Sequence, residues 1–177
     1  AVTVVEWNRL GAFQDVTLRL VAEAMLPQGE GGGNEARTYL QGELRRADVS
    51  LPKPRGGLRF HVYCSPYNAG AVELMAEVSA KQGISIEVTE RVENLLSCER
   101  MLVYLTRKTW TSGQSTAFAR EVERAINADV RLLLCHEMPG VDGEARDAVD
   151  FGAFFACDEG TTPDVLKRGG IYDQIAT

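Results

Sequence analysis

Runs of consecutive apolar residues alternate with amphipathic stretches over the last two thirds of the chain. The apolar runs do not alternate with polar residues, which is typical of strands that are covered on both faces. We predict strands at 58–64, 84–88, 100–106, 130–135 and 151–157. Helices are predicted at 69–82 and 115–127, because apolar side chains recur there at spacings of three and four.

Strands that are separated by helical crossovers pair in parallel. We therefore predict that residues 57–177 form an α/β domain with a five-stranded, doubly wound parallel sheet. About eleven residues separate the second predicted strand from the third, which leaves room for a single helical turn near 94–98. Thr162 and Pro163 predict the start of a last short helix, with the threonine as its cap.

The first 56 residues follow a different pattern. A β-branched strand is predicted over 1–6, followed by amphipathic helices over 13–25 and 36–47. Two prolines and two glycines in the segment 51–57 fit neither a helix nor a central strand. We therefore place a linker there and a domain boundary near residue 56, so that a strand–helix–helix extension precedes the α/β domain.

Composition and charge exclude several classes of function. Hydrophobic residues make up 45% of the 177 residues, charged residues 25%, and the formal net charge is −6. A negative protein is poorly suited to a phosphate backbone, so no nucleic-acid partner is expected. No apolar run reaches the ~20 residues of a membrane helix, so no membrane insertion of this segment is expected.

The cysteines and histidines argue against a metal site. The four cysteines (Cys64, Cys98, Cys135 and Cys157) are far apart in the sequence, and the chain has two histidines. These spacings do not match a zinc site, and we expect no metal. Reduced, buried cysteines are the simpler interpretation, and they suit a reducing, cytoplasmic compartment.

Polar residues follow the predicted strands at the carboxyl edge of the sheet, where open α/β sheets bind their ligands. Ser65, Tyr67 and Asn68 follow the first strand of the domain, and His136 follows the fourth. On the helix 115–127, Glu121 lies at the border of the apolar face. A partly desolvated carboxylate there is a candidate proton acceptor or charge stabiliser. The alternative is a surface glutamate paired with neighbouring arginines.

Three segments carry a resemblance to a known family. They are FHVYCSPYN at 60–68, CERMLVYLTRKTW at 98–110 and FAREVERAI at 118–126. Together they resemble Toll/interleukin-receptor (TIR) domains over residues 58–157. The resemblance implies a flavodoxin-like sheet with the strand order 2-1-3-4-5.

The resemblance also implies chemistry. In the enzymatic branch of TIR domains, a helix glutamate that follows an aromatic residue is the catalytic residue of NAD glycohydrolases, and its position here is Glu121. A carboxylate beside the ribose stabilises the positive charge that develops when the nicotinamide–ribose bond breaks. NAD would then be the substrate. The implied nucleotide-binding residues are Ser65, Tyr67, Asn68, Thr89, Trp110 and Phe118.

Two alternatives stay open. Other TIR domains have no catalytic activity and act by docking to further TIR domains or by self-association, so the chain is also interpreted as a signalling or assembly module. Nucleoside deoxyribosyltransferases are similar in placing a glutamate early in an equivalent helix. The loop after the second strand, 89–93, is short here. In the family this loop closes over the nucleotide or builds the assembly contact.

Overall fold

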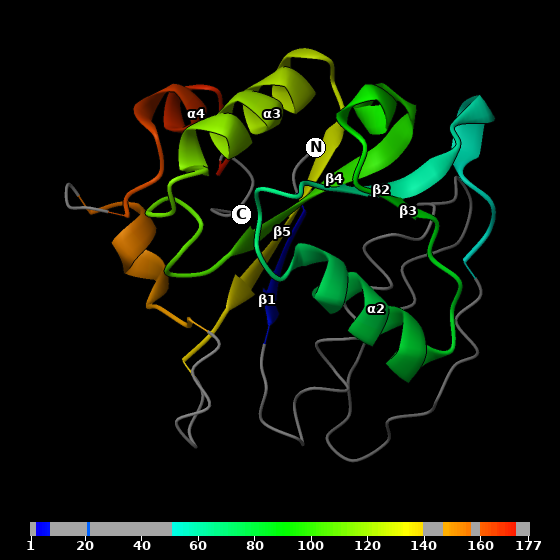
Figure 1. Ribbon diagram of the computed structural model, residues 1–177, viewed down its shortest axis with the longest axis horizontal. Helices are drawn as coiled ribbons and strands as arrows, with labels where there is room; N and C mark the ends of the chain where they lie inside the picture. The colour runs from blue at the N-terminus through cyan, green and yellow to red at the C-terminus, as the bar shows by residue number, and fades with distance from the viewer. Residues whose placement is uncertain (1–2, 8–20, 22–50, 140–146, 157–159, 173–177) are drawn as a thin grey trace, which may run out of the picture.

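The strands lie side by side in one sheet. The computed structural model describes residues 3–7, 21, 51–139, 147–156 and 160–172. All neighbouring strands are parallel, and their order is β1-β5-β4-β2-β3 (Figure 1). The strands are β1 (Thr3–Trp7), β2 (Phe60–Cys64), β3 (Val88–Thr89), β4 (Cys98–Leu105) and β5 (Arg131–Glu137).

Helices cover both faces of the sheet, with α2 on one face and α3 and α4 on the other (Figure 1). The described helices are α2 (Ala71–Gln82), α3 (Ser115–Asn127) and α4 (Asp164–Arg168). Shorter 3₁₀ segments are η1 (Arg55–Gly57), η2 (Val92–Ser97) and η3 (Phe151–Phe154). None of these described helices has both the length and the apolar character needed to cross a bilayer.

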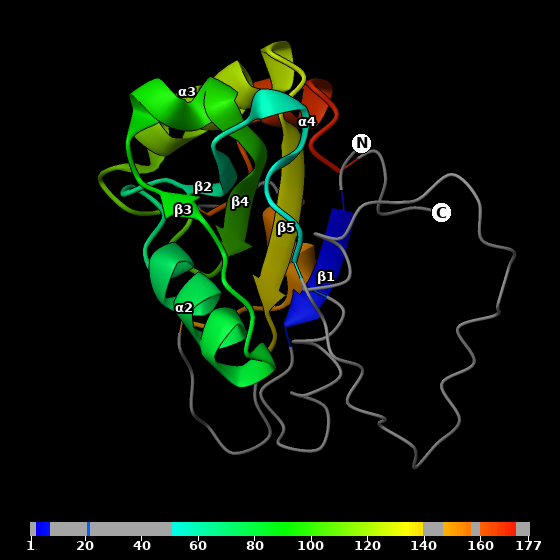
Figure 2. The ribbon, with the colours of Figure 1, turned by 90° about the vertical axis from the view of Figure 1, so that its right-hand side faces the viewer.

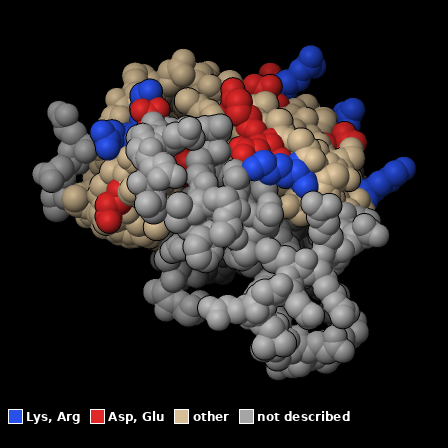
Figure 3. Space-filling model, turned by 90° about the horizontal axis from the view of Figure 1, so that it is seen from below, with Lys and Arg blue, Asp and Glu red and all other residues tan. Residues whose placement is uncertain are grey.

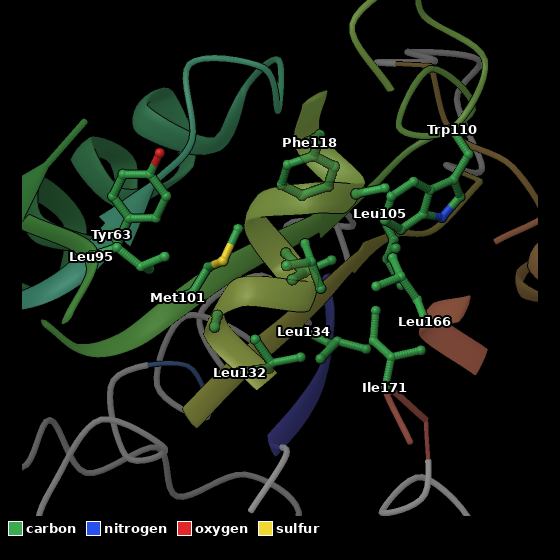
Figure 4. Close-up of a cluster of buried hydrophobic side chains, with 14 of the residues drawn as sticks. Tyr63, Leu95, Met101, Leu105, Trp110, Phe118, Leu132, Leu134, Leu166 and Ile171 are labelled. Carbon is green, nitrogen blue, oxygen red and sulfur yellow. The ribbon is translucent and has the colours of Figure 1, made fainter. Parts of the chain in front are cut away.

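Alternate residues of the central strand serve two different cores. Leu102 and Tyr104 of β4 pack in the cluster that includes α2. Met101, Val103 and Leu105 pack in the cluster beneath α3, which Figure 4 shows. The prediction of strands covered on both faces is therefore confirmed for β4, because every position from Met101 to Leu105 is buried.

The predicted strand at 151–157 is wrong. Residues 151–154 form η3, and the Asp150 side chain accepts a hydrogen bond of 2.8 Å from the Gly152 amide at its start. The outer edge of β5 is already paired with β1, from Thr3 opposite Leu133 onward. The fifth position in the sheet is thus filled by a strand that precedes residue 56, and Figure 2 shows β1 at the edge far from β3.

The local elements agree better with their predictions. Helix α3 has the predicted bounds, and α2 ends at Gly83, whose left-handed φ of 64° suits glycine. The single turn between the second and third strands is η2. The second predicted strand, 84–88, overlaps β3 (Val88–Thr89) only at Val88. The predicted helices 13–25 and 36–47 lie outside the described residues.

Two side-chain predictions have different outcomes. Cys64, Cys98 and Cys135 are free and buried, as expected, while Cys157 lies outside the described residues. Helix α4 follows Pro163 as predicted, but Thr162 does not cap it. The Thr162 hydroxyl instead lies 2.5 Å from the Tyr172 hydroxyl.

Acidic and basic side chains are distributed unevenly on the surface. On the face shown in Figure 3, Asp and Glu side chains gather in a stripe, whereas Lys and Arg side chains stand at separate points. The described part of this face therefore offers no continuous basic surface of the kind that a nucleic-acid backbone requires.

Candidate functional site

Glu121 of α3 is anchored to the sheet by Tyr63 of β2. The Tyr63 hydroxyl donates a hydrogen bond of 2.8 Å to Glu121 Oε2. Tyr63 is fully buried and Glu121 is 9% exposed, so the pair lies between the helix and the sheet. Glu121 thus occupies the buried border of the helix that its spacing indicates, and its hydrogen-bond partner is a phenol.

The two oxygens of Glu121 have different surroundings. Within the described residues, Oε1 makes no hydrogen bond. Among the described residues, Trp110 Nε1 is the only fully buried side-chain nitrogen or oxygen that lacks a hydrogen-bond partner. Glu121 Oε1 is therefore not fully buried. It keeps some contact with solvent.

Tyr63 is a permanent hydrogen-bond donor. Burial raises the pKa of Tyr63 well above its usual value, and the Glu121 carboxylate that accepts its hydrogen bond raises this pKa further. The nearby Ser65 side chain has a smaller, opposite effect on the pKa. The phenol therefore stays protonated at neutral pH and keeps the carboxylate of Glu121 oriented.

Three further predicted residues lie around Tyr63. Thr89 is its register partner on β3, and the Thr89 hydroxyl accepts hydrogen bonds from Arg91 and Asn94. Ser65 Oγ accepts a hydrogen bond of 3.1 Å from the Tyr67 amide in the loop that follows β2. Tyr67 is 37% exposed. The structure therefore brings Glu121, Ser65, Thr89 and Tyr67 together.

Trp110 and Phe118 serve the core. Their rings stack at a centroid distance of 5.2 Å, and Trp110 is only 7% exposed (Figure 4). The indole N–H has no well-formed hydrogen bond, although it lies close enough to the Tyr172 hydroxyl to lower the pKa of that phenol. The structure leaves no open Trp110 face on which a base could stack.

The side-chain amide of Asn68 uses both of its polar atoms in hydrogen bonds to the backbone of β4. Its Nδ2 donates to the Tyr104 carbonyl at 2.8 Å, and its Oδ1 accepts from the Tyr104 amide at 2.7 Å. The pairing of β2 with β4 ends at Cys64 opposite Leu102, so the side-chain amide replaces the missing strand next to Tyr104. The crossovers from β2 and β4 diverge here, where doubly wound sheets usually bind ligands. Asn68 fills part of that position.

Comparison with known proteins does not decide the function. No family model, curated protein or solved structure matches this chain. Among the described residues, no three His, Cys, Asp or Glu side chains are grouped so as to hold a metal ion.

Two cavities lie away from Glu121. They have volumes of about 340 and 360 Å³ and adjoin at Leu96 and Ala128. Neither is lined by Glu121, Ser65 or Tyr67. Four of the predicted residues, Glu121, Ser65, Thr89 and Tyr67, thus lie around Tyr63, and neither of these cavities is beside them.

A second buried pair lies on the opposite face of the sheet. The Tyr104 hydroxyl donates a hydrogen bond to Glu137, the last residue of β5. His136 is buried as well, and its Nε2 donates to the Val149 carbonyl at 2.7 Å. Sequence reasoning missed both tyrosines, because Tyr63 and Tyr104 stand inside apolar strands. The one sequence signal for each is a phenol among apolar residues near the carboxyl end of its strand.

Proposed function

We propose that this chain is a TIR-like α/β domain that binds NAD and hydrolyses its nicotinamide–ribose bond, with Glu121 as the carboxylate at the ribose. The observation that carries the proposal is the difference between the surroundings of the two Glu121 carboxylate oxygens. One oxygen is held by a buried, protonated phenol and the other keeps some contact with solvent. The strand order also supports it, since the four strands of residues 57–177 follow the order 2-1-3-4 of a flavodoxin-like sheet.

The reaction needs little more than a positioned negative charge. The bond between ribose C1′ and the nicotinamide nitrogen breaks, and its electron pair leaves with the ring, which becomes neutral nicotinamide. Positive charge develops on C1′ and the ribose oxygen, where Glu121 Oε1 would stabilise it. Water then adds to C1′ and releases a proton. Tyr63 is a positioning residue, because it acts through Glu121.

Glu121→Gln should lower nicotinamide release from NAD by at least about 100-fold, because the charge at the ribose is lost. Glutamine keeps an oxygen that accepts the Tyr63 hydrogen bond, so the melting temperature should change little. Glu121→Ala is less useful, since it leaves the buried Tyr63 hydroxyl without a partner and costs about 1–3 kcal/mol of stability. Chromatography of the released nicotinamide gives the rate.

The matched control is Glu123→Gln on the same helix, which removes the same charge outside the candidate site. It should retain the rate of the unchanged protein. The proposal fails if Glu121→Gln releases nicotinamide as fast as the unchanged protein, or if the unchanged protein releases none.

The second candidate is a non-catalytic assembly module of the same fold. Asn68 fills part of the ligand position, and neither cavity borders Glu121, which favours this candidate. Large apolar side chains are exposed at Tyr67, Leu96, Phe155 and Val165.

For an assembly module we expect a sedimentation coefficient that rises with protein concentration, and a melting temperature that NAD does not change. Ligand binding to the folded state stabilises it, so a clear upward shift with NAD would contradict this second candidate. Polar substitution of Phe155 or Leu96 is the direct test of which exposed side chain mediates the association.

A further inference from the structure

The cavity of about 340 Å³ lies at the amino ends of β4 and β5, remote from the strand ends that position Glu121. Three arginines line it, namely Arg55 of η1, Arg100 of β4 and Arg131 of β5. Two carboxylates, those of Glu99 and Asp129, line it as well. Three cations against two anions leave a local formal charge of +1.

Arg100 is a buried cation that has no partner among the described residues. It is 7% exposed, and within the described residues its guanidinium makes no hydrogen bond and no ion pair. Its nitrogens are not among the fully buried atoms that lack a partner, so they reach solvent through the cavity that Arg100 lines. Buried arginines are normally paired, because an uncompensated buried charge is costly.

The neighbours of Arg100 increase this cost. Arg131 is its register partner on β5, so both side chains leave the same face of the sheet. Burial lowers the pKa of Arg100, and the positive charges of Arg131 and Arg55 lower it further, while Glu99 raises it. Glu99 is partly engaged, since its Oε1 accepts a hydrogen bond of 2.6 Å from the Arg55 amide. An anion in the cavity would provide the missing countercharge.

We propose that this cavity binds the phosphate group of a small molecule through Arg100, Arg131 and Arg55. Guanidinium groups bind carboxylates and phosphates in a bidentate manner. Three arginines that line one cavity offer more N–H donors than the two oxygens of a carboxylate can accept, whereas a phosphate group presents three or four oxygens. The cavity is therefore assigned to phosphate chemistry, and its assignment does not depend on Glu121.

Calorimetric titration of the full chain with inorganic phosphate and with pyrophosphate tests this site, with chloride holding the ionic strength constant. Comparison of the two affinities shows whether the cavity prefers a single phosphate group or a diphosphate. We expect phosphate or pyrophosphate to bind, and acetate to bind at least about tenfold more weakly. Arg131→Gln should weaken phosphate binding by about tenfold, because one charge-assisted contact is lost.

The matched control is Arg91→Gln, which removes an exposed arginine that does not line the cavity. Its phosphate affinity should equal that of the unchanged protein. Arg131 is itself exposed, so the variant should fold, which thermal melting verifies. The assignment is overturned if neither phosphate probe binds, if acetate binds equally well, or if both arginine variants weaken binding to the same extent. Nicotinamide release should be the same in Arg131→Gln, so this test and that of Glu121 can fail separately.

Discussion

The free energy of unfolding should fall steeply above about pH 9, the ordinary pKa of a cysteine thiol. Burial raises the pKa of Cys98, of Cys135 and of Tyr172 to about 12. Burial also raises the pKa of Cys64 and, together with the Glu121 carboxylate, that of Tyr63. Five groups therefore keep protons in the folded state that the unfolded chain releases.

The sign follows from proton linkage. Between pH 9 and 12 the unfolded chain binds fewer protons than the folded protein, so stability decreases as the pH rises. The stabilisation that these five protonated groups give the folded protein is fully present below the pKa that each has in the unfolded chain. Each group that is protonated in the folded protein and deprotonated in the unfolded chain lowers the free energy of unfolding by about 1.4 kcal/mol per pH unit.

Urea unfolding at a series of pH values through this alkaline range measures the effect. Cys98→Ala removes one titrating group, so the slope of stability against pH should become shallower by about 1.4 kcal/mol per pH unit. The slope is the relevant quantity, because the loss of the thiol also changes packing at every pH. A free energy of unfolding that stays constant up to pH 12 would contradict the prediction.

Asn68→Ala should lower the free energy of unfolding by about 2–4 kcal/mol, since two hydrogen bonds to a buried backbone are lost. The Tyr104 amide would lose the Asn68 oxygen as its acceptor. The Tyr104 carbonyl would still accept a hydrogen bond of 2.8 Å from the Thr109 hydroxyl. Chemical denaturation of the variant gives the loss directly.

Asn94→Ala is the matched control, because it truncates the same side chain at a half-buried position. Its Nδ2 donates one hydrogen bond of 3.2 Å to Thr89 Oγ1. We expect a cost of about 1 kcal/mol there. Equal losses in the two variants would show that Asn68 does not support β4 beyond the end of β2.

Local patterns predicted α2, α3 and the central strands well. The bounds of α3 follow from the spacing of Phe118, Val122 and Ala125, and the end of α2 follows from Gly83. The unbroken apolar runs of β4 and β5 indicated burial on both faces. These features depend on neighbouring residues in the chain, so the sequence contains them directly.

Contacts between distant residues were less accessible. The sequence placed Glu121 at the border of the apolar face and left a surface position open, whereas its partner Tyr63 lies 58 positions earlier in a strand that looks purely structural. Likewise, Arg100 and Arg131 belong to separate strands, and their common cavity exists only because β4 and β5 are adjacent in register. No local pattern contains that register.

The sequence by itself determined that this protein is an α/β domain with a buried parallel sheet, because apolar runs and amphipathic spacing are local properties. The tertiary structure decided which segment completes the sheet. Residues 3–7 occupy the edge of β5, so the aromatic segment 151–154 turns into a 3₁₀ helix and packs against His136. Edge pairing is a competition between segments far apart in the chain, and only the folded protein shows which segment occupies the edge.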